Sequence, residues 1–218
     1  MTSMTTKQTD TRSALLNAAC QLFAKHGYSS VSTRMITELA GVAHSSIHYH
    51  FDTKEALYTE VFRQVFDFDN ALDYEELMRQ EPYVLKTPEG KSYAIHRIVR
   101  DYFKRNVFFR ETWQRELVIR EMYEHSAVYV QLTDTIFRFQ ANRRREFFHL
   151  LKPDATPLEA YFWGNIPESQ GLLYLTLWPS TEQFHDADFM EELKEHVIKT
   201  TSIMMIQLLD LPIPEMLR

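Results

Sequence analysis

The stretch STRMITELAGVAHSSIHYHFDTK, residues 32–54, limits what this chain can fold into more than any other part of it. Apolar residues recur at helical spacing from Ile36 to Ala40, and Thr33 is suited to cap that helix. Gly41 then permits the tight turn that ends the helix. We therefore expect a short helix followed at once by a sharp turn.

A second short helix is expected directly after Gly41, with Val42 and Ile47 facing the core. Its other side chains are mainly hydroxyls, imidazoles and a phenol ring, which make the outer face unusually polar. These polar residues are His44, Ser45, Ser46, His48, Tyr49 and His50. A braced helix, a short turn and a polar second helix form the pattern of a helix-turn-helix, whose second helix fits the major groove of DNA.

The same stretch resembles the TetR family of transcriptional regulators. The residues that agree with the family pattern are Thr33, Arg34, Ile36, Ala40, Gly41, Val42, Ile47, Tyr49, His50, Phe51, Lys54 and Glu55. The resemblance implies an all-α fold: an N-terminal three-helix helix-turn-helix DNA-binding domain, then a larger helical domain for ligand binding and dimerisation. His44 stands where many relatives have Lys or Gln, and His48 replaces a frequent Tyr, so the operator sequence stays undefined.

The polar residues of the stretch have chemistry suited to DNA. Side chains with hydroxyl or ammonium groups are expected on phosphate oxygens. These are Thr33, Ser46, Tyr49 and Lys54. The candidates for base edges or nearby phosphates are Arg34, His44, Ser45, His48 and His50. His44 and His48 have an i, i+4 spacing, but no carboxylate or thiol completes a tetrahedral set, so neither a metal nor a cofactor is predicted.

Composition agrees with an all-α fold, because only 5 Gly occur among 218 residues. The net charge of -6 is unusual for a DNA-binding protein, but it is unevenly distributed. Residues 1–66 hold six basic and five acidic residues, and the remainder hold 18 and 25. The single Cys20 excludes an intramolecular disulfide. Without a signal-peptide core or an apolar run long enough for a bilayer, we expect a cytoplasmic protein with no membrane partner.

Helical periodicity and loop signals suggest a division of the chain. We expect a flexible arm (1–10), a helix-turn-helix domain (11–54), a connecting helix (55–80) and a ligand-binding and dimerisation domain (81–218). Within the last, helices are expected near 92–110, 112–124, 126–151, 156–178 and 187–211, after a loop over 81–91.

Two C-terminal helices have the pattern of a dimer interface. The segment 161–178 is apolar almost all round, and the last helix repeats apolar residues at threes and fours. The residues expected at the interface are Phe162, Leu173, Leu177, Leu193, Val197, Met204 and Leu208. An internal core helix of a monomer is the alternative interpretation.

Aromatic residues make up 13% of the chain and crowd its central helices, a composition that small-molecule cavities use. The candidate ligand-binding residues are His96, Arg100, Phe103, Trp113, Glu116, Arg120, Tyr123 and Phe137. Each aromatic taken singly also suits an ordinary core, and helical spacing does not separate the two roles.

The sequence and the resemblance together predict a homodimeric repressor that a small hydrophobic or aromatic effector releases from a pseudo-palindromic double-stranded DNA operator. A transcriptional activator or a chromosome-organising protein is the alternative within DNA binding. An enzyme is disfavoured, because no Ser/His/Asp or Cys/His arrangement and no phosphate loop occurs. A protein-binding adaptor is suggested only by the weak positive charge of residues 1–66.

Overall fold

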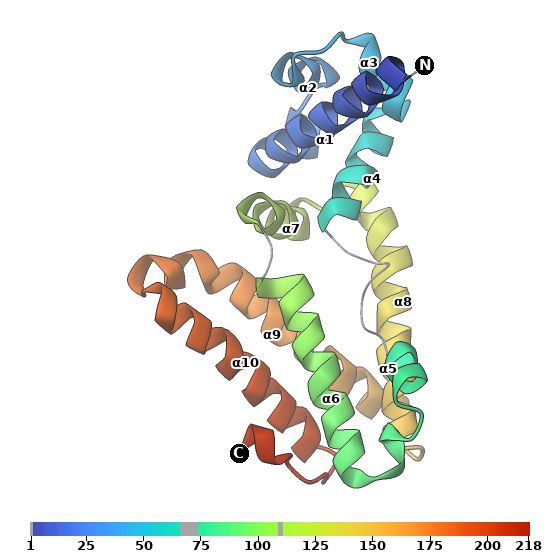
Figure 1. Cartoon of the computed structure of the whole chain (residues 1–218), viewed down its shortest axis with the longest axis vertical. Coiled ribbons are helices and arrows are strands. Elements are labelled where there is room, and N and C mark those ends of the chain that lie inside the picture. The colour runs from blue at the N-terminus through green and yellow to red at the C-terminus, as the bar shows by residue number, and fades with distance from the viewer. Residues whose placement is uncertain (1, 66–73, 109–110) are drawn as a thin grey trace. The chain divides into compact units, whose positions relative to one another are not determined.

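The computed structural model describes residues 2–65, 74–108 and 111–218, with side chains except at 2–9 and 132–137. Every regular element in these ranges is helical, which confirms the predicted all-α fold. The helices form two compact units (Figure 1). The N-terminal unit comprises Met1–Phe68 and Arg110–Thr135, and the C-terminal unit comprises Asp69–Phe109 and Ile136–Arg218. None of the helices described combines the length and the hydropathy that a bilayer span requires.

The N-terminal unit has one apolar core to which all of its helices contribute. These helices are α1 (Thr2–Ser30), α2 (Thr33–Ala40), α3 (Ser45–Phe51), α4 (Lys54–Val65), α7 (Thr112–Glu124) and the beginning of α8 (Ala127–Leu151). Its fully buried side chains include Phe23, Ile36, Ile47, Tyr58 and Leu117. The backbone of residues 2–10 is helical and belongs to α1, in the segment where the sequence predicts a flexible arm.

Gly27 interrupts the helical backbone of α1, with φ 76° and ψ 164°. Glycine adopts this positive φ readily, whereas other residues rarely do, and a Cβ atom at this position would also displace the flexible end of Glu124, whose Oε2 would lie 2.6 Å away. Arg120 of α7 donates from Nε to the carbonyl oxygen of Ala24 (3.2 Å) and from Nη2 to that of Lys25 (3.0 Å). A side chain of α7 thus satisfies the last carbonyl groups before the break.

A fully buried polar pair links α4 to α7. The Tyr58 hydroxyl donates to one carboxylate oxygen of Glu121, and the Ser126 backbone N–H donates to the other (3.0 Å). Burial and the adjacent carboxylate raise the pKa of Tyr58, so the phenol keeps its proton. α7 and the beginning of α8 therefore pack with the first helices, whereas the predicted division assigned them to the domain 81–218.

The predicted connecting helix over 55–80 is described as two helices. α4 ends at Val65, α5 spans Tyr74–Gln80, and residues 66–73 lie outside the described part. Thr53 caps α4, since its Oγ1 accepts from the Ala56 backbone N–H (3.0 Å). Asp52, the residue before Thr53, has a positive φ of 66°.

The C-terminal unit has a second, separate core. It contains α5, η1 (Val84–Lys86), α6 (Pro88–Phe103), the π-helix η2 (Lys104–Phe108), the rest of α8, α9 (Pro157–Phe184), α10 (Ala187–Gln207) and η3 (Glu215–Leu217). The expected loop over 81–91 thus contains η1 and the start of α6, where Thr87 Oγ1 accepts from the Gly90 N–H (3.0 Å). α10 ends at Gln207 rather than at residue 211.

Helix α9 continues through two prolines, although the sequence predicts an end at Trp178. Interior proline costs about 3 kcal/mol because it removes a helical hydrogen bond. Buried residues recur along α9 from Ala160 through Trp163 and Pro167 to Trp178, so the helix is held along its length by the core. Packing of one face outweighs the local cost, and the helix reaches Phe184.

Candidate nucleic-acid interface

The turn between α2 and α3 is fixed by local hydrogen bonds. Ser32 caps α2, since its Oγ accepts from the Met35 N–H (3.2 Å); the predicted cap, Thr33, is the first helical residue instead. Gly41 has φ 67°, and its N–H donates to the carbonyl oxygen of Glu38 (3.2 Å). This left-handed residue ends α2 as predicted.

Two apolar side chains anchor α3 and thereby decide which of its faces is exposed. Ile47 and Phe51 are buried against the N-terminal core. The opposite positions His44, Ser45, His48 and Tyr49 are exposed, with 70% of the Tyr49 side chain accessible, while Ser46 and His50 are half-buried. α3 therefore exposes hydrogen-bonding groups along a face that carries no Lys or Arg.

The imidazoles of α3 have defined surroundings. His48 Nδ1 lies 2.7 Å from the carbonyl oxygen of Asp52. Because a carbonyl only accepts, Nδ1 carries the hydrogen, and in the neutral ring Nε2 is an acceptor. The His50 ring packs edge-on against the ring of Tyr49, with 4.9 Å between centroids. Such fixed rings present donors and acceptors at low entropic cost.

Positive charge around α3 comes from neighbouring elements. Arg34 of α2 is exposed, and its Nε lies 2.7 Å from Glu38 Oε1. An exposed pair of this kind contributes little stability, so a phosphate can replace the carboxylate. Lys54 Nζ lies 4.1 Å from the Tyr28 ring centroid, and burial lowers the pKa of Lys54. Thr33 is half-buried at the start of α2.

Arg12 is a functional candidate that the sequence did not suggest. Its guanidinium lies 5.0 Å from the centroid of the Phe51 ring at the end of α3, and Nη2 lies 3.2 Å from Glu60 Oε1. The residue adds a cation beside the helix-turn-helix. In the sequence, the one indication of this role is that Arg12 is among the six basic residues in 1–66, because no local pattern connects it with α3.

The eight predicted ligand-binding residues are divided between the two units. Those on α7 in the N-terminal unit are Trp113, Glu116, Arg120 and Tyr123, and those on α6 in the C-terminal unit are His96, Arg100 and Phe103. The side chain of Phe137 lies outside the described residues.

The contacts of these residues are mostly structural. Trp113 Nε1 donates to Glu111 Oε2 (2.9 Å), Arg120 holds the end of a helical run in α1, and Tyr123 is 79% exposed. Phe103 is fully buried in the C-terminal core, and Arg100 Nε lies 3.6 Å from Asp101 Oδ1. A pocket confined to either unit cannot contain the whole predicted set.

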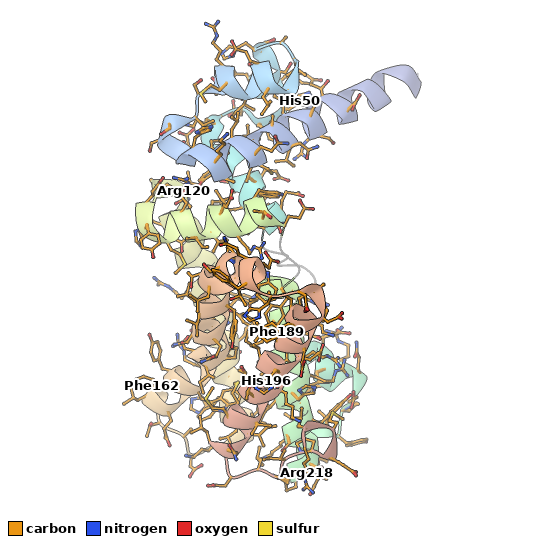
Figure 2. The ribbon with its side chains drawn as sticks, turned by 90° about the vertical axis from the view of Figure 1, so that its left-hand side faces the viewer. His50, Arg120, Phe162, Phe189, His196 and Arg218 are labelled. Atoms are coloured by element: carbon orange, nitrogen blue, oxygen red, sulfur yellow. The ribbon has the colours of Figure 1, made fainter. Side chains whose placement is uncertain are left out.

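The predicted dimer residues lie on α9, on α10 and, in the case of Leu208, directly after α10, mostly on exposed surface. Phe162 is 65% exposed (Figure 2), and Leu173, Leu177, Met204 and Leu208 are also exposed. Leu193 is half-buried. Val197 does not lie on the surface as an interface residue would, because it is only 2% exposed and packs in the C-terminal core. Further exposed apolar residues lie outside the predicted interface set, namely Leu158, Tyr161, Leu172, Phe184 and Phe189.

The fold of the N-terminal unit and the geometry of α2 and α3 define a helix-turn-helix protein. Residues 15–61 match the family described as "Bacterial regulatory proteins, tetR family". The chain is 41% identical over 56 residues to the HTH-type transcriptional regulator RutR of Escherichia coli K12. It is 38% identical over 56 residues to the HTH-type transcriptional repressor KstR2 of Rhodococcus jostii. These matches cover 26% of this chain and 26% and 28% of the two relatives.

Solved structures share the fold over most of the chain. NalD, the secondary repressor of the MexAB-OprM multidrug efflux pump in Pseudomonas aeruginosa, is 19% identical with a TM-score of 0.56, covering 88% of this chain and 93% of NalD. Salmonella enterica GusR is 17% identical with a TM-score of 0.55, covering 92% and 95%. The match to the TetR family is thus confined to the N-terminal segment 15–61, while the fold over most of the chain is shared with these two solved structures.

Proposed function

We propose that this protein is a dimeric DNA-binding regulator of transcription and acts as a repressor. The observation that carries the proposal is the polar exposed face of α3, which Ile47 and Phe51 hold on the core of the N-terminal unit. Its hydroxyls and imidazoles suit base edges and phosphates. The relative named as a repressor, KstR2, is similar over the same segment.

The exposed apolar residues of α9 and α10 support a homodimer. Two copies of α3 about 34 Å apart would enter successive major grooves of a pseudo-palindromic operator. A small hydrophobic or aromatic effector that prefers a different spacing would release the DNA. A coupling of about 1–3 kcal/mol is enough to change operator affinity roughly 5- to 150-fold.

The first experiment compares two tyrosines of almost equal exposure, Tyr49 on α3 (70%) and Tyr83 beside η1 (71%). A binding duplex is selected from random sequences with the full-length protein, and affinity is measured by fluorescence anisotropy. We expect Tyr49→Ala to weaken binding about tenfold or more, since it removes a phosphate contact. Tyr83→Ala should bind as the parent does. Equal affinity of both variants would contradict the proposal.

The second comparison uses two lysines that both lie over a tyrosine ring. Lys54 Nζ is 4.1 Å from the Tyr28 centroid, and Lys86 Nζ is 4.4 Å from the Tyr83 centroid. If Lys54 contacts a phosphate, Lys54→Gln should reduce the slope of log affinity against log salt by about one, whereas Lys86→Gln should not. Failure of the parent to bind any duplex at low salt would favour a protein-binding adaptor instead.

A further inference from the structure

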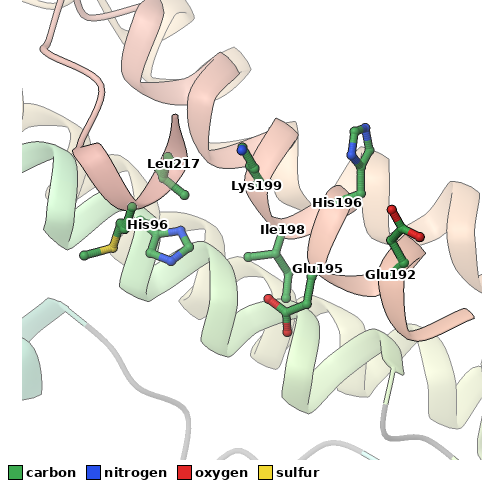
Figure 3. A pocket seen from close by; sticks show the side chains of 8 residues that line it. His96, Glu192, Glu195, His196, Ile198, Lys199 and Leu217 are labelled. Carbon is green, nitrogen blue, oxygen red and sulfur yellow. The ribbon is translucent and has the colours of Figure 1, made fainter. Parts of the chain in front are cut away.

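A hollow of about 360 Å³ lies within the C-terminal unit, between α6, α10 and η3 (Figure 3). Its size is within the range of small-molecule sites. The lining residues are His96, Glu192, Glu195, His196, Ile198, Lys199, Met216 and Leu217. Only His96 belongs to the predicted ligand-binding set.

η3 forms one side of the hollow and is held against α10. Leu217 is buried at 3% exposure, and Lys199 Nζ donates to the main-chain oxygen of Arg218 (2.8 Å). The Lys199 ammonium is therefore already engaged in holding η3. Met216 is exposed and lines the hollow with a long flexible thioether, which can adapt to an apolar guest.

The tautomer of His96 follows from its hydrogen bonds. Ser202 Oγ donates to the carbonyl oxygen of Ile198 (2.7 Å), so its single hydrogen is used. His96 Nδ1, 3.0 Å from the same Oγ, must therefore be the donor. Within the described part of the chain no residue hydrogen-bonds to the other ring nitrogen, Nε2.

Burial is the largest cause that lowers the pKa of His96, and charges of both signs act around the ring. Arg100 and Lys104 act to lower the pKa further, while Glu195 and Asp101 act to raise it. The neutral ring with hydrogen on Nδ1 has a lone pair on Nε2. His96 thus brings a hydrogen-bond acceptor to the hollow.

The charged groups of the hollow favour a cation. Glu192 and Glu195 supply two carboxylates against one ammonium, that of Lys199, which already donates to Arg218. Lys104 Nζ is 3.5 Å from Glu195 Oε1, an exposed pair that a ligand can displace at little cost. Three of the lining residues, Ile198, Met216 and Leu217, supply an apolar surface.

We propose that this hollow binds a small organic amine: its ammonium group meets Glu195 beside the imidazole of His96, and its apolar part lies on Ile198, Met216 and Leu217. A metal ion is a poorer fit, since no group of three or more metal-ligating side chains occurs among the described residues. The site is independent of DNA binding by α3.

The experiment is calorimetric titration of the full-length protein with three probes of similar shape and different charge: phenethylamine, phenethyl alcohol and phenylacetate. We expect binding of the amine and at least tenfold weaker binding of the other two. The double variant Glu192→Gln, Glu195→Gln should weaken amine binding at least tenfold. The control is Glu191→Gln, which removes one negative charge from an α10 residue outside the hollow and should leave the affinity unchanged.

His96→Leu tests the acceptor separately. It should weaken amine binding, while the circular dichroism spectrum stays that of the parent. If His96→Leu fails to fold, the double glutamate variant still tests the proposal, because both glutamates are exposed and their replacement should not affect folding. The proposal is overturned if the amine does not bind, if phenylacetate binds as tightly, or if the double variant and the control lose equal affinity. None of these readouts involves DNA, so failure of operator binding leaves this test intact.

Discussion

The exposed faces of α3 and α9 depart from an ordinary solvated helix in opposite ways. Surface helices usually expose charged side chains. α3 exposes neutral hydroxyls and imidazoles, whereas α9 exposes large apolar residues such as Phe162, Leu173 and Leu177. Extended apolar surface marks a site of association, and closely set donors and acceptors suit a hydrogen-bonding partner. The difference indicates two partners of different chemistry.

The two faces also depend differently on the rest of the protein. α9 has 28 residues, its own capping box and a buried stripe along its length. α3 has 7 residues, too few for an independent helix, and relies on Ile47 and Phe51 in the N-terminal core. Because Tyr58 and Arg120 tie α4 and α1 to α7, the geometry of α3 depends on residues far away in sequence.

The largest effect is expected from a substitution that places a charge on the exposed apolar face of α9. Leu173→Glu should raise the dissociation constant of the dimer about 100-fold or more, since a two-fold interface buries the introduced carboxylate twice. Sedimentation analysis measures the change, with circular dichroism as the check on folding. Operator affinity should fall with the loss of the dimer.

Tyr83→Glu is the control for the apolar face, because it places the same charge on an equally large exposed side chain outside α9 and α10. It should remain dimeric. A Leu173→Glu protein that sediments as the parent does would remove α9 from the interface.

A moderate effect is expected where α7 supports the unit that carries α3. Arg120→Met removes two hydrogen bonds to carbonyl oxygens of α1 and one to the Glu124 carboxylate, and should lower the free energy of unfolding by about 1–3 kcal/mol. Urea unfolding followed by circular dichroism measures it, and hydrogen exchange should show faster opening of α1. Arg79→Met, which breaks an exposed pair with Glu76, should change the stability by less than about 1 kcal/mol. Equal losses in the two variants would show that Arg120 stabilises no more than a surface pair.

The sequence was sufficient to predict the helix-turn-helix, because the residues that determine its geometry lie close together in the chain. Gly41 ends α2 and Ile47 anchors α3 within one short stretch, so spacing and residue type already contain the geometry. The all-α class followed from periodicity and scarce glycine. Arg12 could not be found in this way, because its place beside Phe51 depends on how α1 packs on α3.

The sequence was insufficient to predict which helices pack together, because contacts between segments far apart in the chain determine this. Tyr58 and Glu121 are 63 residues apart, and periodicity shows that a helix has a buried face but not which helix covers it. α7 was therefore assigned to the wrong neighbours. The predicted ligand residues came from aromatic content, which core residues such as Phe103 share. Val197 fitted the apolar repeat of α10 equally well as core and as surface.

The smallest expected effect on stability concerns the capping box at the start of α9. α3 has no side-chain hydrogen bond of this kind at its start. Hydrogen bonds from Lys152 and Thr156 lower the pKa of Glu159 from its usual 4.5 to about 2. The folded state therefore favours the carboxylate, so its stabilisation is present above pH 4.5 and is lost as the pH falls towards 2. Glu159→Gln should flatten the pH dependence of the unfolding free energy in this window, whereas Glu89→Gln, in the first turn of α6, should not. Parallel curves for Glu159→Gln and the parent would show that the exposed carboxylate contributes nothing measurable to α9.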